Sequence, residues 1–314
     1  MSKNFPLFLA VGAGSALALW SQYRKQQSAS LWAYKEARRQ NVRSALITGA
    51  SAGIGETFAW ALAREGYHLV LLARREDRLR ALAGQIQRRY PVQVEILVAD
   101  LGDPADVERV AARIAEMPDL DMLVNNAGFG TSGHFADIDV RPELNMIQVH
   151  VTATVRLTRA ALPGMIARHH GGIINVASMA GLLPLPGNIT YGSTKSYLIF
   201  FSKALQSELA GTGVRVEALC PGFTYSEFHD VARVSRSAIP GFLWMQAEPV
   251  VETAIKGLRE GQVVVIPGIY YRIMAFFLRL PPVAPLARWV QEQRLTRAWQ
   301  DASQAAAPGS NLPG

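Results

Sequence analysis

The chain has 314 residues, of which 49% are hydrophobic and 18% are charged, so it can form one large domain with a buried core. The low charge content excludes a disordered chain or a coiled coil, and the single cysteine, Cys220, excludes a disulfide framework and a multi-thiolate metal site. The net charge of +7 fits an anionic cofactor, an anionic membrane surface or nucleic acid, but the sequence contains no nucleic-acid-binding motif.

The N-terminal region contains an uncharged apolar run over residues 5–20. As a helix it would be about 24 Å long, slightly shorter than the ~30 Å hydrocarbon core of a bilayer. Three interpretations stay open: a membrane anchor, a signal peptide cleaved after Ala-Leu-Ala, or a helix that packs on the protein. We favour a possible anchor over residues 1–24. Basic residues follow the run, which predicts a cytoplasmic catalytic domain; a soluble cytoplasmic protein is the alternative.

Between residues 43 and 267, short apolar runs alternate with longer helical patterns. Alternation of this kind predicts βαβ units and a Rossmann-type, doubly wound parallel sheet in one α/β domain. The ligand crevice is then expected at the carboxyl ends of the strands. The predicted strands are Ala45–Thr48, Leu69–Ala73, Val94–Ala99, Met122–Asn125, Ile173–Ala177, Arg215–Leu219 and Val263–Ile266.

A glycine-rich turn follows the first predicted strand and opens a helix. Its residues are Thr48, Gly49, Ala50, Ser51, Ala52, Gly53, Ile54 and Gly55. Glycines at this place let the backbone approach a pyrophosphate, which the helix N-terminus attracts. The second strand ends at Arg74 and Arg75, where NAD-preferring proteins carry an acidic residue. Two guanidinium groups suit a 2′-phosphate, so we expect NADP(H), with Arg74 as the better candidate for its recognition.

Tyr191 and Lys195 are four residues apart in a helical context and therefore share one helix face. A nearby ammonium lowers the pKa of a phenol, so Tyr191 is the candidate general acid for carbonyl reduction, or base for alcohol oxidation. Ser178 follows a predicted strand and is positioned to hold the substrate oxygen beside the phenol.

With these residues, the chain resembles the short-chain dehydrogenase/reductase family over about residues 43–267. The resemblance rests on TGASAGIG (48–55), NNAG (125–128), Ser178, YGSTK (191–195) and PG (221–222), in the family order. It implies that Asp100 bonds the adenine, that Asn126, Ala127 and Gly128 line the adenosine cleft, and that Lys195 also holds the nicotinamide ribose. It further implies that Pro221, Gly222 and Thr224 meet the nicotinamide and that residues 225–247 form a substrate lid.

One position departs from the family pattern. The family has an asparagine in the helix after NNAG, where it helps to hold a water that links the lysine to a proton relay. Here the residue is His150, between Val149 and Val151. Three interpretations stay open: histidine is an alternative relay member, because it titrates near neutrality; it is a helix residue that slows the enzyme; or the backbone carbonyl at 150 holds the water.

Apolar residues near the predicted crevice indicate an apolar, sizeable substrate, such as a lipid-like, steroid-like or retinoid-like carbonyl; the alternative is that many of them pack the lid itself. They are Phe223, Tyr225, Phe228, Ile239, Phe242, Leu243, Trp244 and Met245 in the lid, and Leu182, Leu183 and Leu185 before Tyr191. After Pro267-Gly268 we expect a helical, apolar extension over 268–303, interfacial or in an oligomer contact, and a disordered tail over 304–314.

The sequence thus predicts a membrane-associated, homo-oligomeric NADPH-dependent oxidoreductase of an apolar carbonyl or alcohol. Two alternatives remain: a catalytically weak NADPH-binding regulator, which the change at His150 permits, and an NAD-dependent alcohol dehydrogenase. No metal site is expected, since His169 and His170 look like loop residues and no metal-ligand spacing occurs.

Overall fold

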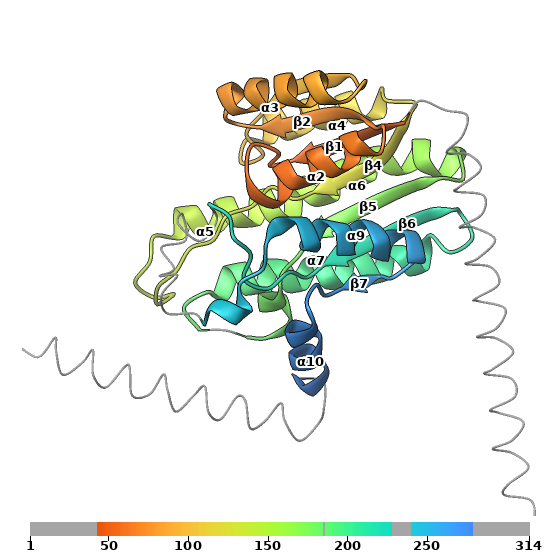
Figure 1. Cartoon of the computed structure of the whole chain (residues 1–314). Coiled ribbons are helices and arrows are strands. Elements are labelled where there is room, and N and C mark those ends of the chain that lie inside the picture. The colour runs from red at the N-terminus through yellow and green to blue at the C-terminus, as the bar shows by residue number, and fades with distance from the viewer. Residues whose placement is uncertain (1–42, 185, 228–239, 279–314) are drawn as a thin grey trace, which may run out of the picture.

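The computed structural model describes residues 43–184, 186–227 and 240–278. Seven parallel strands form one sheet in the order β3-β2-β1-β4-β5-β6-β7 (Figure 1). The doubly wound α/β fold predicted from the sequence is confirmed. The strands are β1 Ser44–Thr48, β2 His68–Ala73, β3 Val94–Val98, β4 Leu120–Asn125, β5 Gly171–Val176, β6 Val214–Leu219 and β7 Val264–Val265.

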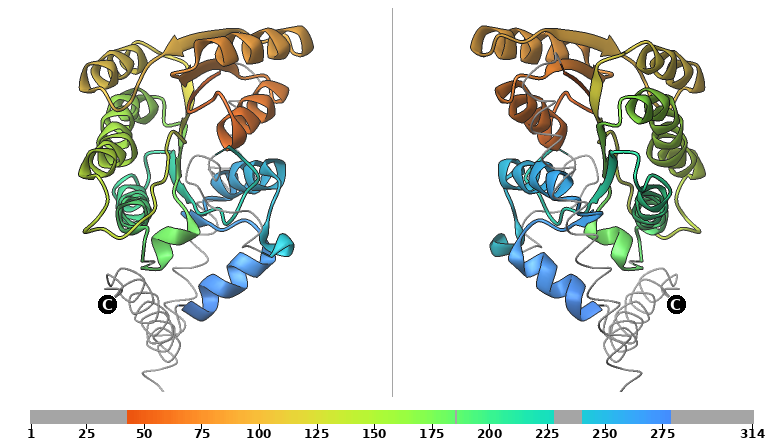
Figure 2. Two further views of the ribbon diagram at one scale, coloured as in Figure 1. Left: turned by 90° about the vertical axis from the view of Figure 1, so that its left-hand side faces the viewer. Right: turned by 90° about the vertical axis from the view of Figure 1, so that its right-hand side faces the viewer.

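Helices cover both faces of the sheet (Figure 2). One face carries α2 Gly53–Arg64, α3 Glu76–Arg89 and α9 Ala247–Glu260, and the other carries α4 Pro104–Ala115, α6 Ala153–Ala167 and α7 Ile189–Glu208. A shorter helix, α5 Val140–Ile147, runs into α6 through one π-helical turn, Gln148–Thr152. Because both faces are covered, the central strands β1, β4 and β5 are buried along their whole length.

The strand order reverses beside β1. From β1 the chain passes outward to β2 and β3, and it then crosses to β4 on the other side of β1. The loops after β1 and β4 therefore diverge at one edge of the sheet, and a crevice at such a switch point is where open α/β sheets bind ligands. The glycine-rich turn and NNAG lie at these two strand ends, as the sequence predicts.

The predicted C-terminal strand is longer than the strand in the structure. The strand expected over residues 263–266 is reduced to Val264–Val265 at the sheet edge. After it, α10 spans Ile269–Leu278, and its residues Tyr271 and Ala275 pack on Met179. The N-terminal segment 1–24, the rest of the 268–303 extension and the tail 304–314 lie outside the described residues. Within the described ranges, no helix is both long and apolar enough to cross a membrane.

Candidate active site

The glycine-rich turn needs backbone angles that glycine adopts more readily than other residues. Gly49 and Gly53 have φ angles of +66° and +60°, which L-residues with a Cβ rarely adopt. Asn126 braces the turn from β4: its side chain donates to Thr48 O at 2.8 Å, and a Cβ on Gly49 would lie 2.8 Å from its Nδ2. Thr48 Oγ1 in return accepts from the backbone N–H groups of Asn126 and Ala127, both at 2.9 Å.

Helix α2 starts directly from this turn with no side-chain cap. Its N-cap is Ala52, whose side chain has no hydrogen-bonding group. The N–H groups of the first turn, at Gly53, Ile54 and Gly55, therefore have no capping oxygen and carry the positive end of the helix dipole. A tight glycine turn that opens onto an uncapped helix N-terminus fits the pyrophosphate of a dinucleotide.

The two arginines after β2 have different surroundings. Arg75 Nη2 donates to Ser51 Oγ at 2.9 Å, and its Nη1 pairs with Glu227 at 2.8 Å. Arg74, the better candidate by sequence, lies 3.7 Å from the carboxylate of Asp100, and its side chain is 72% exposed. The guanidinium that reaches the glycine-rich turn is thus that of Arg75.

Asp100 and Gly128 lie where the adenosine side of the cleft is expected. Asp100 follows β3, and its Oδ1 accepts from the backbone N–H of Gly102 at 2.9 Å. Gly128 follows β4, and a Cβ there would lie 2.7 Å from Nε2 of His150. The geometry therefore places Arg74, Asp100 and the 126–128 segment at the ends of β2, β3 and β4.

Ser178, Tyr191 and Lys195 come together, as the sequence predicts, from the end of β5 and from α7. The hydroxyl of Ser178 forms a hydrogen bond with that of Tyr191, and Ser178 Oγ also accepts from Ala180 N at 3.1 Å. Lys195 Nζ lies 5.6 Å from the centroid of the Tyr191 ring and donates to Val176 O at 2.8 Å.

Burial controls the ionisation of the pair. It raises the pKa of Tyr191 to about 12, against the smaller lowering effect of the Ser178 hydrogen bond. It lowers the pKa of Lys195 to about 7. The expectation that the ammonium dominates the phenol's pKa is therefore not met here, because desolvation has the larger effect on both groups. Tyr191 is a protonated acid at neutral pH, whereas Lys195 is close to its titration midpoint.

His150 is buried, with 1% of its surface exposed, in the π-helical turn between α5 and α6. Nε2 accepts from the backbone N–H of Phe129 at 3.1 Å, and Nδ1 lies 2.9 Å from Thr194 Oγ1. Burial, followed by the charge of Lys195, holds the pKa of His150 well below its ordinary value. Both ring nitrogens are thus engaged by protein groups, and the relay role stays a prediction of the sequence.

Pro221, Gly222 and Thr224 lie after β6, beside Ser178. Met179 N donates to Pro221 O at 3.0 Å, which joins this segment to the turn that follows Ser178. Sequence reasoning missed Tyr271, on α10, whose hydroxyl accepts from Phe223 N at 2.9 Å and donates to Leu243 O at 2.7 Å. A Cβ on Gly222 would collide with the Tyr271 ring, so the glycine of the PG motif is needed here for close packing.

The described parts of the predicted lid form an aromatic cluster. Trp244 stacks on Tyr225 with ring centroids 5.0 Å apart and lies 5.6 Å from the Phe223 ring. Tyr225 N donates to Met245 O, and Met245 N donates to Phe223 O, both at 2.9 Å. The two ends of the lid are therefore paired. Phe228, Ile239 and Leu185, also predicted for the substrate pocket, lie outside the described residues.

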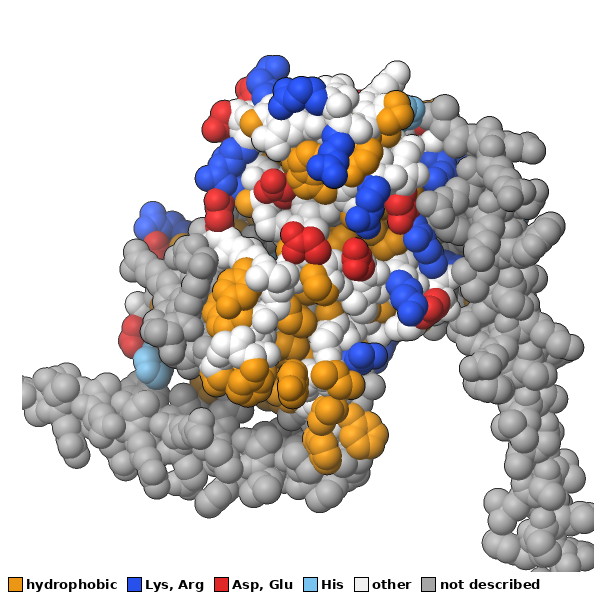
Figure 3. Space-filling view, viewed as in Figure 1, with side chains coloured by type: hydrophobic (Ala, Val, Ile, Leu, Met, Phe, Trp, Pro, Cys, Tyr) orange, Lys and Arg blue, Asp and Glu red, His pale blue; other side chains and the backbone are white. Residues whose placement is uncertain are grey.

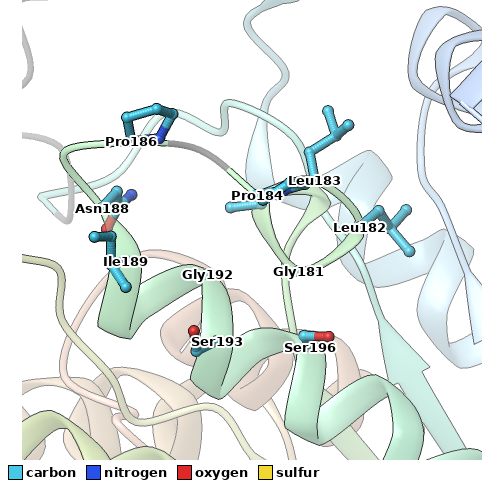
Figure 4. Close-up of a pocket in the computed structure, with 11 residues that line it drawn as sticks. Gly181, Leu182, Leu183, Pro184, Pro186, Asn188, Ile189, Gly192, Ser193 and Ser196 are labelled. Atoms are coloured by element: carbon cyan, nitrogen blue, oxygen red, sulfur yellow. The ribbon is translucent and has the colours of Figure 1, made fainter. Parts of the chain in front are cut away.

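A pocket of about 620 Å³ lies next to this centre rather than in it (Figure 4). It is lined by Ala180, Gly181, Leu182, Leu183, Pro184, Pro186, Asn188, Ile189, Gly192, Ser193 and Ser196. On α7 these positions form the face opposite to Tyr191 and Lys195. Leu182 and Leu183, predicted to face the substrate, thus line a pocket behind Tyr191, and Leu182 also packs on the cluster around Tyr271.

The histidines near β5 have a structural partner. His170 Nε2 lies 2.6 Å from Asp121 Oδ1, at the opposite end of the sheet from the catalytic residues. Among the described residues, no group of three or more His, Cys, Asp or Glu side chains is arranged to hold a metal ion.

Known proteins resemble the chain in sequence and fold. A family model described as short chain dehydrogenase matches residues 43–236. The very-long-chain 3-oxoacyl-CoA reductase of Anas platyrhynchos is 32% identical over 197 residues, 61% of this chain and 62% of that protein, so the match spans less than two thirds of that relative. A sulfoacetaldehyde reductase of Chromohalobacter salexigens is 39% identical over 188 residues, 58% of this chain and 72% of that one.

Among solved structures, a short-chain dehydrogenase from Sphingobium yanoikuyae in complex with NADPH matches with a TM-score of 0.69 and 33% identity. The match covers 87% of this chain and 99% of that chain.

Proposed function

The chain belongs to the short-chain dehydrogenase/reductase family, and on that premise we propose that it interconverts an apolar carbonyl compound and its alcohol with NADPH as the reductant. The observation that carries this proposal is the hydrogen-bonded pair of hydroxyls, Ser178 and Tyr191, beside the buried Lys195. The pair and the glycine-rich turn both lie at the carboxyl ends of the strands, which supports a proton donor and a cofactor that act together.

The residues divide the reaction between them. When bound, the nicotinamide supplies or accepts the hydride. Tyr191 Oη donates its proton to the carbonyl oxygen in reduction and takes it back in oxidation. Ser178 holds the same oxygen and orients it toward the phenol. The Lys195 ammonium, when charged, stabilises the negative charge that develops on the Tyr191 oxygen as its proton leaves.

NADPH is proposed over NADH because the basic group after β2 is attached to the glycine-rich turn. Arg75 contacts Ser51 and is backed by Arg78, and both guanidinium groups share Glu227. A 2′-phosphate beside this turn would meet one or two arginines, and the fork geometry of arginine suits it. The similar structure with bound NADPH is consistent with this choice.

An apolar substrate is proposed because aromatic side chains surround the segment after β6. Phe223, Tyr225 and Trp244 pack together there, with Met245 and Leu243 beside them. Of the similar proteins, one is named for very-long-chain 3-oxoacyl-CoA and one for the small anion sulfoacetaldehyde. The aromatic surroundings favour the long-chain type over the small anion.

We also propose that the protein acts at a membrane surface. On α10, the side chains of Ile269, Tyr270, Ile273, Met274, Phe276 and Phe277 are each at least 38% exposed. Figure 3 shows hydrophobic side chains gathered at this end of the molecule. An exposed apolar helix suits the headgroup region of a bilayer, and with the apolar N-terminal run it supports membrane association with a cytoplasmic catalytic domain. Flotation of the full chain with phosphatidylcholine vesicles tests this, and a chain that stays in the bottom fraction would contradict it.

We also propose that the chain forms a homo-oligomer. Leu144 on α5 and Tyr197 and Phe200 on α7 are large apolar side chains exposed at 59%, 42% and 75%, and such exposure is usual at subunit contacts. Light scattering of the purified protein in detergent measures the mass, and a monomer at micromolar concentration contradicts the proposal.

The reaction is tested with a panel of carbonyl compounds at fixed NADPH, with NADH in parallel, by following nicotinamide absorbance. The panel contains long-chain 3-oxoacyl thioesters, steroid ketones, retinal, sulfoacetaldehyde and sugars. Reduction of the apolar compounds with NADPH supports the proposal, whereas a preference for sugars or sulfoacetaldehyde refutes the substrate class. If NADPH binds but no compound is reduced, the alternative of a catalytically weak NADPH-binding regulator replaces it.

A further inference from the structure

The hydrogen bonds around His150 fix both its charge and its tautomer. The backbone N–H of Phe129 can only donate, so Nε2, 3.1 Å away, is an unprotonated acceptor. In a neutral ring the proton is then on Nδ1, which donates to Thr194 Oγ1 at 2.9 Å. Thr194 Oγ1 in turn donates to the backbone oxygen of Tyr191 at 2.9 Å. Every donor in this chain of bonds has one acceptor. In an imidazolium, Nε2 would carry a hydrogen that points at the hydrogen of the Phe129 N–H, so two donors would face each other.

This chain of bonds joins three separate segments. It runs from the loop after β4, through the π-helical turn before α6, to the first turns of α7. The His150 ring also lies edge-on to the rings of Phe129 and Tyr191, with centroids 6.0 and 5.8 Å apart. The π-helical turn widens the backbone at this point, and such single turns are frequent at functional sites.

Charged groups near the ring oppose its protonation. Lys195, which follows Thr194 on α7, is the cation that acts on it. Lys195 itself donates to Val176 O and not to residue 150. Tyr191 remains a neutral phenol at physiological pH. The imidazole is thus surrounded by a cation, a phenol and an apolar ring, and among the described residues no carboxylate shifts its pKa.

We propose that His150 is a positioning residue: a neutral cross-link of one tautomer that holds the loop after β4 against the catalytic helix and thereby fixes the place of Tyr191. In this role the histidine keeps its Nδ1 proton and transfers none during turnover. Its kinetic consequences rest on the proposed reaction, but its tautomer and charge do not.

The direct test is NMR of protein labelled with ¹⁵N-histidine, with the His150 signals identified by their loss in His150→Gln. We expect Nε2 at the shift of an unprotonated nitrogen and Nδ1 at that of a protonated one, unchanged between pH 5.5 and 8.5. A ring that titrates near pH 6.5, or that carries its proton on Nε2, overturns the proposal. This measurement needs no substrate, so it stands even if no carbonyl compound is reduced.

The kinetic test uses a matched pair at residue 194. Thr194→Ser keeps the hydroxyl that links His150 to the Tyr191 backbone, and Thr194→Val removes it. We expect Thr194→Val to lower kcat about tenfold with little change in KM, because small displacements of a catalytic group reduce rates strongly, and Thr194→Ser to retain kcat within about twofold. Equal losses for Val and Ser overturn the link.

A double-mutant cycle separates one linked chain of bonds from two independent contacts. If His150 acts through Thr194, adding Thr194→Val to His150→Gln lowers kcat little further. If instead the losses of kcat in the two single variants multiply in the double variant, His150 acts independently of Thr194. If the wild-type kcat–pH profile has a step near pH 6.5 that disappears in His150→Gln, His150 transfers protons.

A third arm uses the close approach of Gly128. A Cβ there would lie 2.7 Å from His150 Nε2, so Gly128→Ala lowers the melting temperature in the wild-type background. If the ring is held at this place, the same change lowers the melting temperature less in His150→Ala, and an equal loss in both backgrounds contradicts the proposed position of the ring.

Discussion

Arg75 is tied to the glycine-rich turn by two hydrogen bonds to one atom: its Nε and Nη2 both donate to Ser51 Oγ, at 3.2 and 2.9 Å. Glu227, from the segment after β6, pairs with the same guanidinium at 2.8 Å. A negatively charged group that binds beside Ser51 would thus either displace the Glu227 carboxylate from the Arg75 guanidinium or share the guanidinium with it. The proposed preference for NADPH rests on this arrangement.

We expect Arg75→Ala to weaken NADPH binding by about ten- to a hundredfold, the effect of losing one or two charge-assisted hydrogen bonds. NADH, which lacks the 2′-phosphate, should lose no more than about threefold. Arg74→Ala is the matched comparison and should have the smaller effect, because Arg74 faces Asp100 and solvent. Dissociation constants from the fluorescence of the bound dihydronicotinamide decide this, and equal losses of NADPH and NADH affinity in Arg75→Ala contradict the cofactor assignment.

Removal of the Tyr191 hydroxyl tests the proton donor. Tyr191→Phe should lower kcat by about two to four orders of magnitude, the usual contribution of a positioned acid, with NADPH affinity unchanged. Tyr197→Phe is the control, since Tyr197 lies on the same helix but is 42% exposed. Steady-state rates at saturating NADPH provide the comparison, and a Tyr191→Phe enzyme that retains more than a tenth of the wild-type kcat would assign the proton to another group.

The sequence predicted much of the fold because its signals are local. Buried parallel strands appear as apolar runs, and the glycine turn, Ser178 and the Tyr191–Lys195 spacing each lie within one strand–loop–helix unit. All seven strands were therefore located, although the last spans only Val264–Val265 in the structure.

Long-range contacts were beyond prediction. The residues around Arg75 in the sequence do not indicate that Arg75, rather than Arg74, contacts Ser51. Which of the two side chains reaches Ser51 depends on the backbone direction at the end of β2. Tyr271 contacts Gly222 and Phe223 from 48 residues away in sequence. The ionisation of Tyr191 was misjudged for a related reason: charge proximity can be inferred from spacing, whereas the degree of burial depends on the whole fold.

Lys195 predicts a pH dependence of stability. Burial lowers its pKa in the folded protein to about 7 from 10.5, so between those values the unfolded chain binds more protons and stability rises with pH. Lys195→Met removes this dependence. Relative to wild type, it should therefore increase the free energy of unfolding by about 3 kcal/mol more at pH 6 than at pH 9.

Urea unfolding at both pH values measures the difference. Lys203→Met is the control, because Lys203 is exposed on the same helix and should give the same small effect at pH 6 and pH 9. If the change in unfolding free energy caused by Lys195→Met is also the same at pH 6 and pH 9, the lysine keeps an ordinary pKa in the folded protein.

Tyr271 couples α10 to the substrate side of the site. Its hydroxyl is the partner of both the Phe223 N–H and the Leu243 carbonyl, so Tyr271→Phe leaves two backbone groups unpaired and should lower the free energy of unfolding by about 1–2 kcal/mol. The segments that carry Phe223 and Leu243 also bear the aromatic cluster, so KM for the carbonyl substrate should rise more than kcat falls. Tyr270→Phe is the control, because Tyr270 is 58% exposed. Thermal melts and steady-state kinetics of both variants test the coupling, which is refuted if the two substitutions have the same effect.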